Sequence, residues 1–265
     1  MCYFLLLITF AFGQDCVSGD CLNGYGKIIY QDGSEFMGIF QNGKRNGEGI
    51  YIYVDGSTYI GEFNNNFIEG NGELTYSNGE IYIGEFKNGK SNGLGKYTSS
   101  DGSIYEGEFS GGVQTGNGTL IMNNGDKYSG DFYNRKLIGS GIWISSNGEQ
   151  YTGEFYNSLF HGQGKYMYLD GSYYNGEYLY GRKEGYGTFI DSNEGKYIGE
   201  FKSDFFNGNG IYYFSNGSIY NGEFKNGLFH GLGTFKLDSN HKLVGNFLDG
   251  EFILSCPVPP SCMIE

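Results

Sequence analysis

Proline is nearly missing from this chain of 265 residues, since it occurs only as Pro257, Pro259 and Pro260. Glycine occurs 48 times, yet collagen is excluded, because its triple helix needs abundant proline and a glycine at every third position. The chain also lacks any run of Lys or Arg and carries a net charge of −13. A polyanionic partner would be repelled, so we expect no nucleic-acid partner.

Aromatic residues are abundant, with 25 Tyr and 22 Phe. A chain this aromatic is not expected to be intrinsically disordered. Glycine favours tight turns and aromatic residues favour strands, so the composition indicates β-strands joined by tight turns.

The N-terminus differs from the rest of the chain, because residues 3–12 (YFLLLITFAF) form an apolar run of ten. A transmembrane helix needs about twenty such residues. The run is typical of a secretory signal peptide over residues 1–13, and the small residues Ala11 and Gly13 favour cleavage before Gln14. The sequence therefore predicts a protein of the secretory pathway or the extracellular space. The n-region lacks Lys and Arg, so a buried N-terminal strand in a cytoplasmic, membrane-associated protein is the alternative.

Two pairs of cysteines lie at the ends of the predicted mature chain: Cys16 with Cys21, and Cys256 with Cys262. Their placement predicts two short disulfide clamps in an oxidising compartment. A four-cysteine zinc site would require the two ends to meet. Secretion would also give meaning to two N-glycosylation sequons, at Asn117 and at Asn216.

One segment, Y-x-G-E-F, recurs with a period of 23 residues. Its first residues are Tyr59, Tyr82, Tyr105, Tyr128, Tyr151, Tyr174, Tyr197 and Tyr220, with Phe36 one period earlier and Leu243 one period later. Pairs such as Asp55-Gly56 and Asn88-Gly89 mark two turns per period. We predict ten hairpins over residues 24–250, with an N-terminal cap at 14–23 and a C-terminal cap or tail at 251–265. The turns at 194–195 and 238–241 break the pattern and should be irregular.

Alternation along the strands predicts what the hairpins bury. Tyr, Gly and Phe of Y-x-G-E-F share one face, and Glu lies on the other. The facing strand adds a third column of large residues: Ile28, Tyr51, Leu74, Tyr97, Leu120, Trp143, Tyr166, Phe189, Tyr212 and Phe235. A lone hairpin is marginal in water, so each unit must stack on its neighbours. The expected fold is all-β, an elongated single-layer antiparallel β solenoid with an aromatic core.

The pattern Y-x-G-E-F-x-x-G-x-x-x-G-x-G, followed by an Asp-Gly or Asn-Gly turn, resembles the MORN repeat over roughly residues 22–252. The resemblance implies a solenoid of about ten stacked 23-residue hairpins. It also implies a non-enzymatic scaffold or membrane-apposition module that often self-associates.

The sequence predicts no catalytic, cofactor or metal site. His161 and His230 occupy the same slot of two repeats, where most units carry Asn, so we interpret them as polar caps beside the G-x-G turn. The eight carboxylates at the fourth position of Y-x-G-E-F should form a solvated column, with weak attraction for a basic partner as the alternative. The glycine-rich turns lead into strands, whereas a phosphate-binding loop leads into a helix.

Three functions remain open from the sequence. The first is a scaffold that binds another protein or a second copy of itself, because repeats stack to present a long regular surface. The second is a module that binds anionic lipid, such as phosphoinositides, which rests on the family resemblance. The third is a glycan-binding platform of aromatic rings. The candidate residues on the aromatic face are Tyr97, Trp143, Tyr166 and Tyr212.

Overall fold

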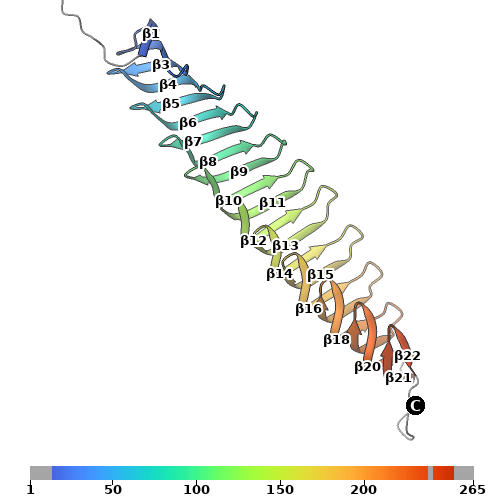
Figure 1. The fold of residues 1–265 in the computed structure, drawn as a ribbon. Helices are drawn as coiled ribbons and strands as arrows, with labels where there is room; N and C mark the ends of the chain where they lie inside the picture. Colours follow the sequence, from blue (N-terminus) through green and yellow to red (C-terminus); the bar gives the residue numbers. More distant parts are fainter. Residues whose placement is uncertain (1–13, 238–240, 254–265) are drawn as a thin grey trace, which may run out of the picture. The chain divides into compact units, whose positions relative to one another are not determined.

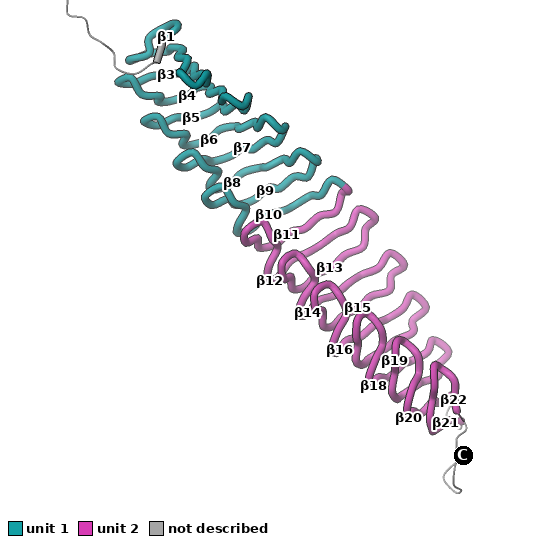
Figure 2. Tube along the Cα trace, in the orientation of Figure 1, with its two compact units in different colours: residues 1–123 teal, residues 124–265 magenta. Residues whose placement is uncertain are grey.

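The computed structural model describes residues 14–237 and 241–253, and these residues form β-strands and turns without any helix (Figure 1). The chain divides into two compact units, residues 1–123 and residues 124–265 (Figure 2). Unit 1 contains β1 (Gln14–Gly19), β2 (Tyr25–Tyr30), β3 (Glu35–Gln41), β4 (Lys44–Ile52), β5 (Thr58–Asn64), β6 (Phe67–Thr75), β7 (Ile81–Lys87), β8 (Lys90–Thr98), β9 (Ile104–Ser110) and β10 (Val113–Ile121).

Unit 2 contains β11 (Lys127–Tyr133), β12 (Lys136–Ile144), β13 (Gln150–Tyr156), β14 (Leu159–Met167), β15 (Tyr173–Leu179), β16 (Arg182–Ile190), β17 (Lys196–Lys202), β18 (Phe205–Tyr213), β19 (Ile219–Lys225), β20 (Leu228–Lys236), β21 (Lys242–Leu248) and β22 (Glu251–Ile253). Within each unit, every strand pairs antiparallel with the next strand of the chain. Each unit is thus a single-layer meander of stacked hairpins, which confirms the predicted fold class.

The two segments predicted as caps each add a strand. β1 pairs with β2, and β22 pairs with β21. A disulfide joins Cys16 to Cys21, whose Cα atoms are 6.1 Å apart. The predicted signal peptide, Cys256 and Cys262 lie outside the described residues.

Two kinds of turn alternate along each unit. The short turns, such as Asn88-Gly89 with φ of 51° and 75°, are two-residue turns whose left-handed backbone suits Asn and Gly. The long turns, such as residues 53–57, place Gly56 at φ 88°, and the Asp55 carboxylate accepts a bond from the Ser57 N–H at 2.9 Å. The turn at Glu194 is irregular as predicted, because Glu194 takes the glycine position at φ 67°. Residues 238–240 lie outside the described residues.

The core lies on the sheet face that carries the tyrosine and the phenylalanine of Y-x-G-E-F, which we call the core face. Tyr59 is fully buried, and its ring meets Phe63 at 5.2 Å and Phe86 of the next repeat at 5.0 Å, both edge to face. The intervening glycines are required, because a Cβ on Gly61 would lie 2.5 Å from the Gly72 Cα across the ladder. The aromatic core is thus continuous from repeat to repeat within each unit.

The carboxylates at the fourth position of Y-x-G-E-F differ from the solvated column that the sequence predicts. At this point the register shifts, for example between Gly84 and Phe86, and the bulge leaves backbone groups without a ladder partner. The Glu85 carboxylate accepts a bond from the Leu94 N–H at 2.9 Å, and the Tyr82 hydroxyl donates to the Glu85 carbonyl at 2.8 Å. The same carboxylate bond recurs at Glu62, Glu108, Glu154, Glu177, Glu200 and Glu223. The carboxylates therefore stabilise the bulge and do not form a merely solvated column.

Repeat 128–150 departs from this arrangement. It carries Asp131, one methylene shorter, and within the described part of the chain no bond joins that carboxylate to the Ser140 N–H. Tyr128 is only half-buried, whereas Leu137 is fully buried. The repeat keeps its hairpin, because β11 still pairs with β12.

Candidate functional site

The four aromatic residues singled out from the sequence, Tyr97, Trp143, Tyr166 and Tyr212, lie half-buried on the core face. The ring of Trp143 packs against Tyr166 at 5.9 Å. Internal acceptors occupy two of the hydroxyls, because Tyr166 donates to Glu149 and Tyr212 donates to Asp191, each at 2.9 Å. These rings therefore act first as packing partners of the core.

A further column on the core face went unrecognised in the sequence, and we call it the stacking column. Its members are Arg45, Ile68, Ser91, Gln114, Leu137, Phe160, Lys183, Phe206, Phe229 and Phe252. Phe206 lies flat on the buried Tyr197 with centroids 3.9 Å apart, and Phe229 stacks on Tyr220 in the same way. The stacking column covers the core, so an apolar ring is the residue that this position favours.

Arg45 places a cation in the stacking column of unit 1. Its guanidinium lies 4.9 Å from the ring centroid of Tyr51 and 5.4 Å from that of Phe63. Its Nη2 donates to the Asn66 carbonyl at 2.7 Å. Arg45 therefore brings its charge into the core face together with a protein acceptor.

Lys183 places the equivalent cation in unit 2. Its Nζ lies 5.1 Å from the ring centroid of Tyr168, 5.4 Å from that of Tyr174 and 5.5 Å from that of Phe189. No acceptor for this ammonium occurs among the described residues. Burial lowers the pKa of Lys183, and the negative charge of Asp204 opposes that shift.

Tyr178 lies directly across the ladder from Lys183. It replaces the phenylalanine of Y-x-G-E-F and is 5 % exposed. Its hydroxyl is buried, and no partner for it lies in the described part of the chain. Burial also raises the pKa of Tyr178 far above that of an exposed phenol. We call Lys183 and Tyr178 together the Lys183–Tyr178 pair, because the antiparallel ladder places the two residues opposite each other on the core face.

A row of exposed apolar side chains follows the short turns of unit 2, and we name it the aromatic edge. Its members are Tyr133, Tyr156, Leu159, Leu179, Tyr180, Phe205 and Leu228. Tyr180 is 58 % exposed and has φ 48°, where the equivalent turns mostly carry Asn. A bulky residue in this backbone conformation is strained. His161 lies between Tyr156 and Tyr180, with ring centroids 5.5 and 5.2 Å away.

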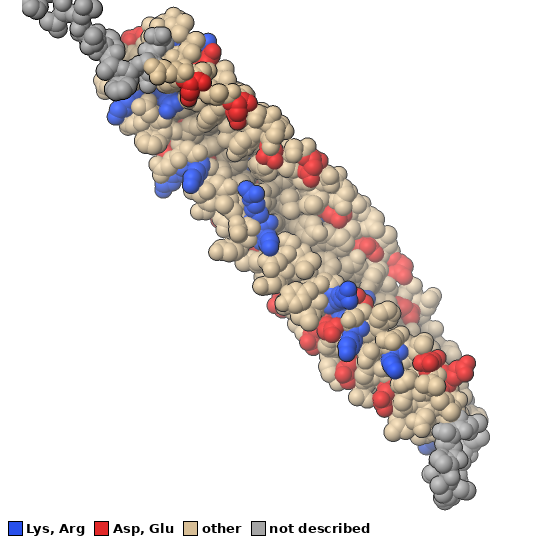
Figure 3. Space-filling view, in the orientation of Figure 1, with Lys and Arg blue, Asp and Glu red and all other residues tan. Residues whose placement is uncertain are grey.

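Charge is divided between the two kinds of turn. Ten of the 17 Lys and Arg residues lie at or beside the short turns: Lys44, Arg45, Lys87, Lys90, Arg135, Lys136, Arg182, Lys183, Lys202 and Lys225. The long turns carry Asp32, Asp55, Glu80, Asp101, Asp126, Glu149, Asp170, Asp191 and Glu194. Figure 3 shows basic side chains along one margin of unit 1 and acidic ones along the other, whereas in unit 2 acidic side chains also lie among the basic ones. The aromatic edge of unit 2 therefore lies beside both basic side chains and the short-turn carboxylates of Asp204 and Asp249.

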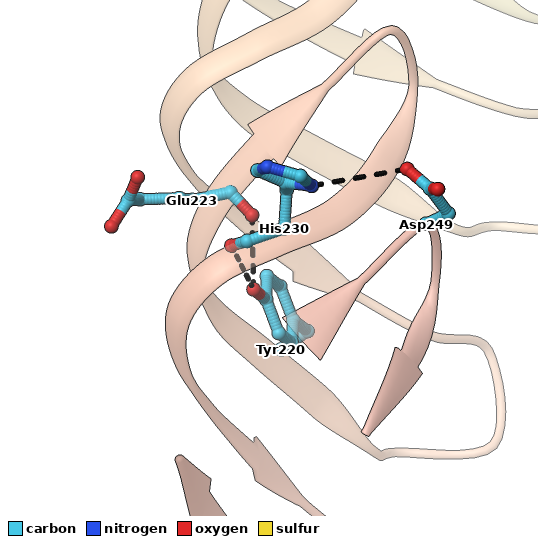
Figure 4. A network of polar contacts seen from close by, with 4 residues as sticks. All are labelled: Tyr220, Glu223, His230 and Asp249. Carbon is cyan, nitrogen blue, oxygen red and sulfur yellow. Dashed lines mark hydrogen bonds and ion pairs between the residues drawn. The ribbon is translucent and has the colours of Figure 1, made fainter. Parts of the chain in front are cut away.

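His161 and His230 occupy a position at which the side chain of other repeats caps the next repeat, whereas the buried Nδ1 atoms of the two histidines have no hydrogen-bond partner among the described residues. At this position Glu69 accepts from the Asn88 N–H at 2.9 Å, and Glu184 accepts from the Ser203 N–H at 2.7 Å. The Nδ1 of His230 faces Asp249 at 3.9 Å, and its carbonyl accepts from the Tyr220 hydroxyl at 3.3 Å (Figure 4). No cluster of side chains able to hold a metal occurs in residues 14–237 and 241–253.

Both sequons are exposed. Asn117 lies on β10, and Asn216 lies in a long turn. The Asn216 Oδ1 accepts from the Ser218 N–H at 3.0 Å. In the same described residues, no helix is long and apolar enough to cross a bilayer.

The family model described as MORN repeat matches residues 22–35, 36–58, 59–81, 82–104, 105–127, 151–173, 174–196, 197–219 and 220–242. It leaves out residues 128–150, the repeat with Asp131. No curated protein sequence matches the chain.

Three solved structures show partial likeness. The TCP10 domain of Danio rerio CPAP is 13 % identical with a TM-score of 0.41, covering 71 % of this chain and 88 % of that one. The SAS-4 (dCPAP) TCP domain of Drosophila melanogaster, in complex with a proline-rich motif of Ana2, is 12 % identical with a TM-score of 0.34, covering 76 % and 90 %. Virginiamycin B lyase from Staphylococcus aureus is 9 % identical with a TM-score of 0.18, covering 88 % and 87 %. Scores this low carry no inference about function.

Proposed function

The chain belongs to the MORN-repeat family, and from that premise we propose that it is a non-enzymatic scaffold whose aromatic edge binds a partner protein. The observation that carries the proposal is the aromatic edge itself. A contiguous row of exposed apolar side chains marks an interaction surface. Tyrosine and arginine dominate the energetics of such surfaces, and both occur here, as Tyr133, Tyr156, Tyr180, Arg135 and Arg182.

The charges of unit 2 specify the chemistry of the partner. Arg135, Lys136, Arg182, Lys202 and Lys225 flank the aromatic edge. A partner segment that combines apolar side chains with Asp or Glu would complement this surface. A uniformly anionic membrane is less well matched than a short peptide segment, because it would also meet Glu154, Glu177 and Glu200 on the strands that lead into the same edge, whereas a segment can place its carboxylates at the basic residues alone.

A random-peptide selection on the full-length protein tests the proposal. The triple variant Tyr133→Ser, Tyr156→Ser, Tyr180→Asn removes the tyrosines of the aromatic edge, and Phe67→Ser removes the exposed aromatic residue of unit 1 that is equivalent to Phe205 of this edge. We expect selected peptides to be rich in apolar and acidic residues. We also expect them to lose at least about tenfold in affinity for the triple variant but not for Phe67→Ser.

Other occupants give different outcomes. If the selected peptides bound the triple variant as tightly as the unmodified protein, the aromatic edge would not be the binding surface. Flotation on vesicles that contain anionic lipid, without peptide binding, would replace a protein partner with a membrane. A saturable response to a glycan panel would favour the glycan platform, and sedimentation as a dimer that the triple variant abolishes would identify the partner as a second copy.

We also propose a lumenal or extracellular location. The apolar run at residues 3–12 and the Cys16–Cys21 disulfide support it, since disulfides persist in oxidising compartments. Intact-mass analysis of the protein from its native source should show a chain that begins at Gln14, four oxidised cysteines and glycans on the sequons. A full-length mass with free thiols would contradict this location.

A further inference from the structure

The repeats of this chain serve as internal controls for one another, because each position has the same structural task in every copy. Repeat 174–196 departs from its neighbours at four such positions. Tyr178 replaces phenylalanine, Tyr180 stands where Asn is commonest, Lys183 replaces a stacked ring, and Glu194 replaces glycine. Local departures that cost stability are expected at functional sites.

We infer that Lys183 and Tyr178 form a binding site on the core face of unit 2 for the carboxylate of a ligand that also carries an apolar or aromatic group. The inference goes beyond the proposed function, because the site lies on the core face whereas the aromatic edge follows the short turns. Lys183 offers up to three donors and Tyr178 one, and neither group finds an acceptor in the described chain.

The comparison with Arg45 separates this site from ordinary packing. Arg45 fills the same position of the stacking column, and the Asn66 carbonyl accepts from it at 2.7 Å. Lys183 has aromatic neighbours of the same kind without such an acceptor. The Lys183 ammonium has no hydrogen-bond acceptor in the described chain, and only the charge of Asp204 acts on it, so an external acceptor fits it. The Arg45 guanidinium already has one acceptor, the Asn66 carbonyl, although its buried Nε has no partner among the described residues.

The surrounding charges select a carboxylate over a phosphate. One ammonium matches one negative charge, and the Tyr178 hydroxyl, which is buried, supplies a neutral donor through a single water. Glu149 and Asp191, which accept from Tyr166 and Tyr212 on the same face, would repel a dianion. The half-buried rings of Tyr168 and Phe189 provide a surface for the apolar part of the ligand.

A matched pair of small probes tests the inference without any variant. N-acetyl-phenylalaninate carries the carboxylate and a ring, and N-acetyl-phenylalaninamide has the same shape without the charge. In the full chain labelled with ¹³C at lysine Cε, we expect the acid to shift the Lys183 resonance saturably and to bind at least about tenfold more tightly than the amide. Equal binding of the two probes, or no saturable shift at Lys183, would overturn the inference.

Variants then assign the two donors. Lys183→Met keeps an unbranched apolar stem and should weaken the acid at least about tenfold, whereas Arg45→Met should leave its affinity unchanged. Tyr178→Phe should weaken the acid by a smaller factor of about three to ten. The triple variant of the aromatic edge should bind the acid normally, so failure of this site and failure of the proposed function are distinguishable. Tighter binding of phenyl phosphate than of the acid would overturn the carboxylate assignment.

Discussion

Arg45 in unit 1 and Lys183 in unit 2 occupy equivalent positions of the stacking column, yet their charged groups differ in hydrogen-bond acceptors. Both cations lie over aromatic rings, at 4.9 Å from the Tyr51 centroid and 5.1 Å from the Tyr168 centroid. Arg45 also donates to the Asn66 carbonyl, whereas no acceptor for Lys183 Nζ occurs among the described residues. This difference is the basis on which we assign the Arg45 charge to the structure and the Lys183 charge to a ligand.

The largest effect is expected when Arg45 is removed. Arg45→Ala deletes the ring contacts and leaves the Asn66 carbonyl without its donor, so the free energy of opening β3 to β6 should fall by about 2–3 kcal/mol. Native-state hydrogen exchange measures this strand by strand, which suits a repeat array that does not unfold in one step. A loss no larger than that of Lys183→Ala would abolish the distinction between the two cations.

Replacing Lys183 by phenylalanine, the residue at this position in the neighbouring repeats, should raise the free energy of opening the strands. Lys183→Phe restores a ring that can stack on Tyr174, as Phe206 stacks on Tyr197 at 3.9 Å, and it removes a poorly hydrated charge. We expect β15 to β18 to gain about 1–2 kcal/mol in hydrogen exchange. Arg45→Phe is the matched control and should not stabilise unit 1.

Tyr178→Phe tests whether the hydroxyl across the ladder from Lys183 has an acceptor within the protein. The substitution removes a buried hydroxyl without an acceptor and should stabilise β15 and β16 by about 1 kcal/mol. Tyr174→Phe is the control, because its hydroxyl donates to the Glu177 carbonyl at 2.9 Å, and it should destabilise the same strands. Destabilisation by both variants would mean that the Tyr178 hydroxyl has an internal partner.

The smallest effect concerns the short turn of the same repeat. Tyr180→Asn places a residue that tolerates φ 48° and should stabilise the hairpin of β15 and β16 by about 0.5–1 kcal/mol. The reverse change, Asn157→Tyr in the equivalent turn with φ 52°, should cost a similar amount. Hydrogen exchange measures the stability of both hairpins. If neither substitution changed it, the backbone at Tyr180 would not be strained.

The sequence predicted the fold because its period is constant and its turn residues recur. Most repeats place Tyr, Gly and Phe on one face, so alternation alone predicts the ladder between Tyr59 and Tyr51 that the structure contains. The family match over residues 22–242 confirms the same repeat.

The functional details were harder to predict, for physical reasons. The stacking column holds Arg, Ile, Ser, Gln, Leu and Lys once each and Phe four times, so no residue type marks it in every repeat, and only the alternation of faces could have placed it on the core face. The capping role of Glu85 depends on a bulge, which the sequence spacing does not reveal. The Lys183–Tyr178 pair becomes visible only when the other repeats show what each position normally holds.

The caps between repeats have one further consequence. The side chains of Asn23, Glu69 and Glu184 each accept from a turn N–H about one period later, at Asn42, Asn88 and Ser203. In each of these pairs the acceptor precedes its donor in the chain, so a ribosome or a translocation channel delivers the cap before the turn that needs it. Bonds of the opposite order join the same repeats, because the N–H groups of Arg45, Leu137 and Lys183 donate to the side chains of Asn66, Ser158 and Asp204 about one period later. Truncation after a repeat therefore leaves some earlier donors without an acceptor, and loss of residues 14–23 removes the first acceptor, Asn23.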